Sequence, residues 1–540
     1  MLEHLTSDVR LLARSVRDGT RPVPVAGLTP GEAVRVRRGR SVLEARIVDR
    51  FDAWALRDQC RDRVTEALRD AGIAHVQLDA VREEPHRVVV ASSDIEALRA
   101  TLSVLGTERR LHLARITSRG AGPARALPRL PGIRSGDVLR VFSPQVSVTG
   151  RLLPTMALGV DIEIWERIRT SRASPDGRML PAGSLVAPRT NPRTRTLTPQ
   201  ELAAAQADRR GQSPPLEQVT FPVDVVYTWV DSSDPAWRAD FDARRAGDSL
   251  AGSHASAWSP ARFTSREELR YSLRSLVAHA NWVRRIHVVT SGQVPHWLDT
   301  SHPQINVVRH DEIFPDPDDL PTFNSHAIEA CLHRIPGLSE HYVYFNDDVF
   351  LARPLRPEDF FGAGGDIRYF PSRIPVDDEL PSDVDLPVVS AFKNGRRVIE
   401  RHFARRPMTR PRHTPHPQHR GVIEEIERAE PELVARTRRA RFRSATDISL
   451  AAQLQSSWAA ATGRGVATDT SYEFIDIWSP DVDARINRLL LRDDVDFYCL
   501  NETWIDPEQC ETADARVARV LKMLLPFASP FETDVRSEPR

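Results

Sequence analysis

His341-Tyr-Val-Tyr-Phe-Asn-Asp-Asp-Val-Phe-Leu351 is the stretch of the chain that decides the fold. Its aromatic and β-branched residues, Tyr342 to Phe345, predict a short buried strand. A buried strand that ends in Asn346, Asp347 and Asp348 places two carboxylates where a parallel sheet opens to its ligand crevice. Such a pair suits a hard divalent cation, Mg²⁺ or Mn²⁺, that also binds substrate phosphates. Taken alone, this Asp-Asp pair would favour an acidic turn without a metal. The surrounding segments are therefore needed to choose between a turn and a metal site.

The segments around this stretch alternate between strand and helix patterns. Strands are predicted over residues 223–230, 286–290 and 305–309, with helical spacing of apolar residues between them. This alternation favours an α/β fold with a mainly parallel sheet, consistent with a nucleotide-sugar glycosyltransferase-like core of the A type. Further helices, predicted over 422–439 and 448–462, are expected to pack over the opening of the sheet.

Two helix starts can be predicted from capping residues. Thr264 or Ser265 can cap the first helix, and Glu267 or Glu268 would complete a capping box. Ser325 is the predicted cap of the second helix.

The remainder of the chain gives weaker patterns. A helix over 58–71, a strand over 88–91 and a β-rich segment over 138–162 indicate a smaller α+β domain at the N-terminus. Many Pro, Thr and Gln residues follow, with one short helix predicted over 199–209. We therefore expect an α+β domain of unknown role over 1–180, a Pro-rich linker over 181–220, a catalytic domain over 221–533 and a tail over 534–540.

The composition argues against several classes of protein. With 540 residues, 41% of them hydrophobic, the chain can form two or three domains. Its 74 basic residues balance its 74 acidic residues, so no bulk charge favours nucleic acid or an anionic membrane. No stretch reaches the roughly 18–20 apolar residues of a membrane span, and the N-terminus does not resemble a signal peptide. A cytoplasmic protein that can associate with the inner face of the membrane is expected.

The cysteines are scattered along the chain at Cys60, Cys331, Cys499 and Cys510, without CxxC spacing. This pattern predicts neither a disulfide framework nor a zinc site. Cys499 and Cys510 could form a pair, but isolated buried thiols are the favoured interpretation.

Several longer motifs occur in a fixed order. They are residues 223–235, 266–276, 282–293 and 320–329, then the Asn-Asp-Asp strand, then 412–417 with 443–447, and 498–503 with 525–532. This set resembles the Stealth family of hexose-1-phosphate transferases. The family includes bacterial capsule and exopolysaccharide phosphotransferases and the catalytic subunit that makes the lysosomal mannose-phosphate tag. The resemblance covers residues 220–533.

The resemblance implies roles for particular residues. His413 would be the general base, with His416 as the alternative, because an imidazole can accept a proton at neutral pH. Arg443 would grip the transferred phosphate, Glu329 would lie in the active site, and Asp348 would act both in catalysis and, with Asp347, as a metal ligand. The predicted substrate-binding residues are Asp224, Asp231, Asp234, Asn324, Asn346, Asp447 and Asn501.

Other interpretations of these residues stay open from the sequence. Asp231 and Asp234 fit an Asx-type turn as well as a nucleotide pocket. Glu329 could form a helix-surface pair with a histidine, and His413 could lie in a solvated Arg- and His-rich loop. Glu502 stands where Stealth proteins commonly have Asp, which puts a metal role for it in doubt.

The predicted reaction is transfer of a sugar-1-phosphate from a nucleotide-diphosphate sugar, such as UDP-GlcNAc or a related hexose donor, to a glycan hydroxyl. A phosphodiester in capsule, exopolysaccharide or cell-wall polysaccharide forms and a nucleoside monophosphate leaves. The alternatives are a metal-dependent glycosyltransferase that moves the sugar itself, which would release a nucleoside diphosphate, and a non-catalytic glycan-binding protein. No nucleic-acid partner is expected.

Overall fold

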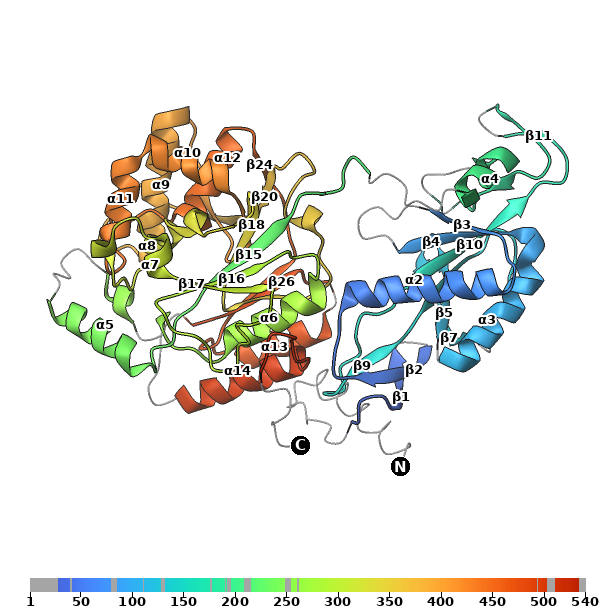
Figure 1. The fold of residues 1–540 in the computed structure, drawn as a ribbon, viewed down its shortest axis with the longest axis horizontal. Helices are drawn as coiled ribbons and strands as arrows, with labels where there is room; N and C mark the ends of the chain where they lie inside the picture. Colours follow the sequence, from blue (N-terminus) through green and yellow to red (C-terminus); the bar gives the residue numbers. More distant parts are fainter. Residues whose placement is uncertain are drawn as a thin grey trace. The chain divides into compact units, whose positions relative to one another are not determined.

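The computed structural model divides the chain into two compact units, Met1–Pro215 and Leu216–Arg540 (Figure 1). The predicted tail over 534–540 lies outside the described residues. No described helix combines the length and the apolarity needed to cross a bilayer. The structure describes residues 28–38, 41–78, 85–109, 111–127, 132–174, 177–189, 191, 196–207, 215–247, 254–259, 262–492, 494–502 and 510–533.

The first unit contains a mostly antiparallel sheet with the order β14-β13-β10-β8-β5-β6, to which β4 adds as a parallel neighbour of β10. Apolar side chains of this sheet and of helices α2 and α3 form one core, as expected for an α+β domain. The elements are β1 (Ala33–Arg38), β2 (Ser41–Val48), α2 (Ala53–Asp70), β3 (His75–Leu78), β4 (His86–Ala91), α3 (Ile95–Arg109), β5 (His112–Thr117), β6 (Gly120–Ala121), β7 (Arg125–Ala126), β8 (Val138–Phe142), β9 (Gln145–Ser147), β10 (Val160–Arg167), β11 (Arg172–Ala173), β12 (Met179–Leu180), β13 (Leu185–Val186), β14 (Thr196–Leu197) and α4 (Pro199–Ala207).

The described residues of the predicted linker up to Pro215 belong to the first unit, whereas residues 216–220 belong to the second, where Val219 packs into the core. Leu185 of β13 is buried beside Trp165 of β10, and Leu197 and Leu202 pack against the same cluster. The Pro-rich composition of this segment gave no sign that its apolar residues, which are spaced along the chain, would pack into a core. The short helix predicted there is present as α4.

The second unit is built on a five-stranded sheet with the order β17-β16-β15-β18-β23. The first four strands are parallel and β23 is antiparallel to β18, which confirms the predicted mainly parallel α/β core. Thr228 lies opposite Asn346, so β15 and β18 end at the same edge. The strands are β15 (Val223–Thr228), β16 (Ile286–Thr290), β17 (Ile305–Arg309), β18 (His341–Asn346) and β23 (His416–His419).

Two predicted helix caps are wrong. Glu267, with φ 64°, precedes α6 (Glu268–His279) and forms no capping bond, and the Glu268 carboxylate instead accepts the Arg266 N–H at 2.5 Å. Asn324 rather than Ser325 caps α8 (Ser325–Glu329), because its side chain accepts the His326 N–H at 3.0 Å.

A second, three-stranded sheet, β19-β26-β25, joins the C-terminal part of the chain to the Asn-Asp-Asp stretch. Val349 pairs with Cys499, and the Leu500 N–H donates to the Asp348 carbonyl at 3.1 Å. Buried side chains of α13 and α14 pack beside this sheet. The elements are β19 (Val349–Leu351), β25 (Tyr472–Asp476), α13 (Val482–Leu491), β26 (Phe497–Asn501) and α14 (Cys510–Leu524).

Helices α9 to α12 gather beside β18, in the upper left of Figure 1. The helix predicted over 422–439 is two helices, because Pro431 starts a new one. The segment predicted over 448–462 begins with a π-helical turn, Leu450–Leu454, before α12. The remaining elements are α5 (Pro235–Gly247), α7 (His310–Ile313), β20 (Ile367–Tyr369), β21 (Pro371–Pro375), α9 (Pro387–Phe403), β22 (Thr409–Pro411), α10 (Arg420–Ala429), α11 (Pro431–Arg439), α12 (Gln455–Ala461) and β24 (Gly465–Ala467).

Candidate functional site

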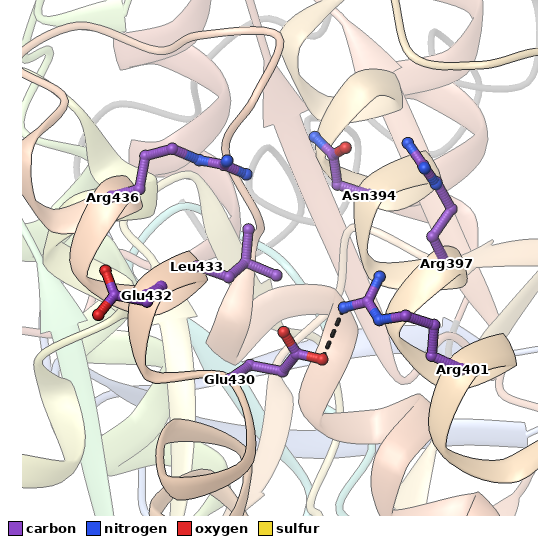
Figure 2. A pocket seen from close by; sticks show the side chains of 7 residues that line it. All are labelled: Asn394, Arg397, Arg401, Glu430, Glu432, Leu433 and Arg436. Atoms are coloured by element: carbon purple, nitrogen blue, oxygen red, sulfur yellow. Dashed lines mark hydrogen bonds and ion pairs between the residues drawn. The ribbon is translucent and has the colours of Figure 1, made fainter.

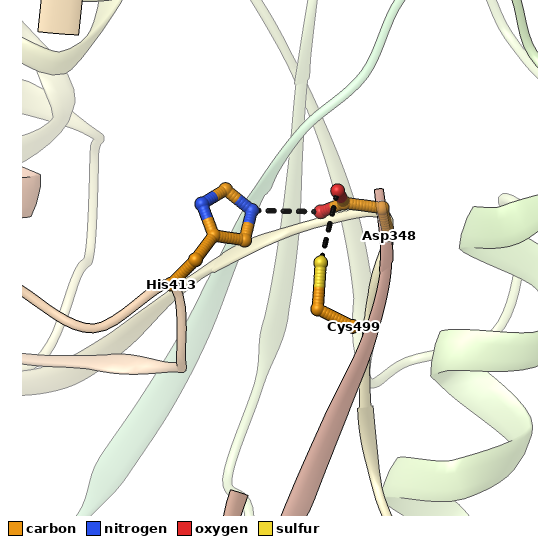
Figure 3. Close-up of side chains that lie close together, drawn as sticks. All are labelled: Asp348, His413 and Cys499. Carbon is orange, nitrogen blue, oxygen red and sulfur yellow. Dashed lines mark hydrogen bonds and ion pairs between the residues drawn. The ribbon is translucent and has the colours of Figure 1, made fainter. Parts of the chain in front are cut away.

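Asp348 is the centre of a polar cluster at the carboxyl end of β18. Its Oδ1 lies 3.1 Å from His413 Nε2 (Figure 3). Its Oδ2 accepts hydrogen bonds from the Asn501 amide at 3.1 Å and from the Cys499 thiol at 3.3 Å. The sequence therefore brings together His413, Asp348 and Asn501 from three segments that are far apart along the chain.

His413 and Asp348 form a coupled acid–base pair. Burial alone would lower the pKa of His413, but the charge of Asp348 and its hydrogen bond raise that pKa above the ordinary value. Burial would raise the pKa of Asp348, but His413 and the Asn501 and Cys499 donors lower it. The pair therefore favours an imidazolium facing a carboxylate.

Asn346 gives the imidazole a second partner, since its Nδ2 lies 3.2 Å from His413 Nε2. One ring nitrogen cannot donate to Asp348 and accept from Asn346 at once. The protonated ring can donate to Asp348, and the neutral ring can accept from Asn346. The geometry can therefore hold His413 in place in both protonation states.

His416 differs from His413 in its surroundings. It lies in β23, opposite Tyr344 in the sheet, with the two rings stacked 6.2 Å apart. Burial, and then the charge of His413, lower its pKa to about 3. His416 is therefore neutral at physiological pH, and no carboxylate among the described residues pairs with it to stabilise a proton taken from a substrate.

Asp347 and Glu268 add two carboxyl groups beside Asp348. Burial and repulsion by Glu268 and Asp348 raise the pKa of Asp347 well above its ordinary value. Burial raises the pKa of Glu268 to about 7, and Asp348 adds to this shift. A hard divalent cation binds oxygen ligands and would offset the repulsion between neighbouring carboxylates. Asp347 and Asp348 therefore fit Mg²⁺ or Mn²⁺.

A different donor set is closer in geometry. Among the described residues, the ligand atoms of Asp348, His413 and Cys499 lie within 4.8 Å of one another (Figure 3). Sulfur and imidazole ligands suit a softer ion than Mg²⁺, and hydrogen bonds already join these groups. The carboxylate set is therefore the better match to a magnesium-type cation.

Arg443 and Arg262 are two arginines that lie near each other, and the charges of Arg443 and Arg410 both act on His413. Burial lowers the pKa of both guanidiniums, and at Arg262 burial and the charge of Arg443 together lower it to about 8. Arg443 donates to the Ser325 hydroxyl, and Arg262 donates to the Ser256 carbonyl at 2.5 Å. Neither forms an ion pair with a carboxylate in the described part of the chain, so both charges are available for an anion.

An aromatic cluster holds these two arginines near each other. Phe263 and Phe442, the chain neighbours of Arg262 and Arg443, both pack on Phe241, with ring centroids 5.3 and 5.6 Å away. The cluster is buried and also includes Trp237 and Phe323. Aromatic packing therefore fixes the backbone on both sides of the cationic pair.

Asn324 and Asp447 brace the segment that carries Arg443. The Asn324 amide donates to Asp447 Oδ2 at 2.9 Å and to the Phe442 carbonyl at 3.3 Å. Asp447 Oδ2 also accepts the Ser444 N–H at 2.9 Å. Both residues are buried, and these bonds position Arg443.

Glu329 is buried below Arg443 rather than paired with a surface histidine. Its Oε2 accepts from the Ser449 hydroxyl at 2.7 Å and from the Ala452 N–H at 3.3 Å. His333 pairs instead with Glu427, at 2.9 Å. The negative charge of Glu329 acts against the lowering of the pKa of Arg443 by burial.

Asp231 and Asp234 follow the carboxyl end of β15 and support the local backbone. Asp231 Oδ1 accepts the Ser233 N–H at 2.8 Å, as in an Asx turn. Asp234 accepts the Ala236 and Trp237 N–H groups, at 2.8 and 3.0 Å, at the start of α5. In each of these two carboxylates, a single oxygen, Oδ1, accepts these backbone hydrogen bonds.

Asp224 does not join the site. It lies near the amino end of β15, opposite Tyr342, whereas Asp348 follows the carboxyl end of β18. Arg284 binds it through two nitrogens, at 2.8 and 2.6 Å, and the Ser339 N–H donates to it at 2.8 Å. A fully buried carboxylate saturated in this way is a structural ion pair.

The structure adds three residues that sequence reasoning missed. The sequence predicts only an isolated buried thiol at Cys499 and a capping-box partner at Glu267 or Glu268, and it gives no role to Arg262. Only their neighbours in space single them out, since no spacing in the sequence links them to Asp348 or Arg443. Glu502 is also explained, because Arg266 binds it at 2.7 and 3.0 Å and Trp478 donates to it at 2.9 Å, which leaves it a structural partner.

Comparison with known proteins identifies the family. Stealth protein conserved regions 1, 2 and 3 match residues 221–249, 262–368 and 412–455. An exopolysaccharide phosphotransferase of Streptomyces coelicolor is 40% identical over 89% of this chain and 83% of its own length. The chain belongs to the Stealth family. A second exopolysaccharide phosphotransferase of the same organism is 37% identical over 92% of this chain and 87% of its own.

Membership of the Stealth family supports a transferase role of the phosphotransferase or glycosyltransferase type. The matched Stealth regions contain Asp348, His413 and Arg443, whereas Asn501 lies beyond them. A crystal structure of the galactosyltransferase LgtC with donor and acceptor sugar analogues aligns with 57% of this chain and 97% of its own, at 12% identity and a TM-score of 0.29. A score this low carries no argument about the site.

Proposed function

We propose that this Stealth protein transfers a sugar-1-phosphate from a nucleotide-diphosphate sugar to a glycan hydroxyl. The observation that carries the proposal is the 3.1 Å contact of His413 with Asp348, close to the charge of Arg443, which forms no ion pair with any described carboxylate. The charge of Arg443 is close enough to lower the pKa of His413. A base beside an anion-binding guanidinium is what attack on a phosphate diester or anhydride requires.

In the proposed step, neutral His413 accepts the proton of the acceptor hydroxyl while that oxygen bonds to the β-phosphorus, the one that carries the sugar. The bond from the β-phosphorus to the bridging oxygen breaks, and the nucleoside monophosphate leaves with the electron pair. Arg443 and Arg262 donate to the phosphate oxygens. Positioning and charge stabilisation supply most of the catalysis in reactions of this class.

Asp347 and Asp348 would hold Mg²⁺ or Mn²⁺, which supplies Lewis-acid stabilisation of the diphosphate. We assign Asn346 and Asn501 to orientation of His413 and Asp348, and Asp231 and Asp234 to the loop that faces the nucleotide. The buried residues Glu329, Asn324 and Asp447 would position Arg443. In this assignment Asp224 does not contact the substrate. It supports the fold through its ion pair with Arg284.

The deciding experiment identifies the released nucleotide. Purified protein is incubated with Mg²⁺, a panel of nucleotide-diphosphate hexoses that includes UDP-GlcNAc, and glycan acceptors. Monophosphate release that depends on the acceptor and disappears in His413→Ala supports the proposal. Diphosphate release would instead establish transfer of the sugar alone, and no acceptor-dependent release from any donor would favour a glycan-binding protein.

The proposed product places the protein in capsule, exopolysaccharide or cell-wall polysaccharide synthesis. Nucleotide sugars are cytoplasmic metabolites, so we propose a cytoplasmic enzyme that acts at the inner face of the membrane. Cell fractionation with an antibody to the protein tests this location.

A further inference from the structure

A donor-rich pocket of about 370 Å³ lies between α9 and α11 (Figure 2). Asn394, Arg397 and Arg401 come from one face of α9, at helical spacings of three and four residues. Arg436 reaches in from α11. The volume is within the range of pockets that bind small molecules and can accommodate a sugar phosphate.

The charges in this pocket are only partly balanced. Arg401 is neutralised by Glu430 at 2.6 Å, and Glu430 also binds His402 at 2.8 Å. No carboxylate in the described part of the chain pairs with Arg397 or Arg436. The Glu432 carboxylate points away from Arg397 in Figure 2. The pocket therefore offers the guanidinium donors of Arg397 and Arg436 to an oxyanion.

The pocket is connected to the segment that carries Arg443. The Asn394 amide donates to the carbonyls of Ala445 and Asp447, both at 2.8 Å. Arg436 donates to the Thr446 carbonyl at 3.3 Å. These contacts join the wall of the pocket to the segment, residues 443–447, that carries Arg443.

We propose that this pocket binds a phosphodiester of the acceptor glycan, one linkage or more away from the hydroxyl that reacts. The inference rests on the proposed function, because a product joined by phosphodiesters becomes the next acceptor. Arg397 and Arg436 grip the charged oxygens, and Asn394 supports the segment below them. The pocket makes an acceptor that already contains a phosphodiester a better substrate than a neutral one.

The test compares two acceptors with one charge-reversal variant. Arg397→Glu/Arg436→Glu is assayed for nucleotide release with a neutral oligosaccharide and with the same oligosaccharide carrying one phosphodiester. We expect KM for the phosphodiester acceptor to rise at least about tenfold. The value of kcat, and the KM for the neutral acceptor, should stay unchanged. Arg245→Glu, an exposed residue of α5, is the matched control and changes neither value. Equal KM values in the variant and the wild type would overturn the inference.

Binding measurements separate this inference from the proposed function. Calorimetry titrates the wild type and the double variant with a disaccharide phosphodiester and, separately, with UDP-GlcNAc. Loss of phosphodiester binding in the variant supports the pocket even if no monophosphate is ever released. Weakened binding of UDP-GlcNAc with unchanged phosphodiester binding would assign the pocket to the donor and overturn the inference. Arg397→Gln/Arg436→Gln repeats both titrations without introducing negative charge.

Discussion

Asp224 and Asp348 are two carboxylates on the neighbouring parallel strands β15 and β18, at opposite ends of the same sheet. In both, burial would raise the pKa and hydrogen bonds from a cationic partner lower it. At Asp224 the main partner is Arg284, which keeps its charge at all accessible pH values, and His287 is a second partner at 3.3 Å. At Asp348 the partner is His413, whose charge can be lost. A carboxylate whose cationic partner is always charged can stabilise the fold. A carboxylate whose partner can lose its proton can take part in proton transfer.

The largest effect expected from this comparison is on catalysis. His413→Ala removes the proposed base and should lower kcat by about 10²–10⁴, the range typical of general acid–base groups. Asp348→Ala should be at least as severe, because it removes both the partner of the base and a proposed metal ligand. Single-turnover assays of nucleotide release measure both.

The control for these variants is His416→Ala, which removes a neighbouring imidazole that is neutral and lacks a carboxylate partner. It should keep most of the activity. Loss of activity in His416→Ala with activity retained in His413→Ala would reverse the assignment of the base.

The next effect concerns stability at the other end of the sheet. Asp224→Ala leaves the guanidinium of Arg284 without its partner and removes an acceptor from the Ser339 N–H. Breaking a buried ion pair typically costs about 3–5 kcal/mol, reduced here because Arg284 is itself partly exposed. We expect the denaturant midpoint of this unit to fall and kcat per folded molecule to stay unchanged. A stable variant with a low kcat would mean that Asp224 belongs to the site after all.

Sequence patterns predicted the parallel strands well, because each strand is a short apolar run whose burial follows from its composition. Strands β16 and β17 have the predicted boundaries. The helix starts were predicted less well. Ser and Glu residues near Arg266 satisfied a capping pattern, but the Glu268 side chain faces the carboxylates of the site instead.

The site was only partly predictable for a related physical reason. The order of the motifs indicated Asp348, His413 and Arg443. The residues that shift the pKa values of these groups were not singled out by any motif. Cys499 reaches Asp348 only because β26 pairs with β19. Asp224 lies at the opposite end of the sheet from Asp348, and the sequence does not reveal this because a carboxylate in a strand gives no sign of which end of the sheet it will lie at.

Glu268 allows a third prediction, on the pH dependence of stability. Its pKa is about 7 in the folded state against an ordinary 4.5, so the folded protein binds a proton that the unfolded chain releases. Stability of metal-free protein should therefore fall as pH rises from about 4.5 to 7, by an amount of the order of 1–3 kcal/mol. Thermal unfolding in chelator measures this slope.

The matched variant is Glu268→Gln, which should flatten the slope and raise the stability of the metal-free protein above pH 7. Mg²⁺ should stabilise the wild type more at pH 8 than at pH 5, because the carboxylates are charged at the higher pH. A slope that is the same in both proteins would show that the pKa of Glu268 is not raised in the folded protein by burial and by the charge of Asp348.

The smallest effect expected is a shift in the pKa of His413. Because the charge of Asp348 and its hydrogen bond raise this pKa, Asp348→Asn in metal-free protein should lower it. The protonated form then persists over a narrower range, and the neutral ring, which can accept from Asn346, dominates at lower pH. NMR titration of the imidazole carbon signals follows the change directly, with His416 as an internal reference that stays neutral through the same range. An unchanged pKa for His413 would mean that Asp348 does not set its protonation, and the contrast between a titratable pair at one end of the sheet and a permanent pair at the other would then fail.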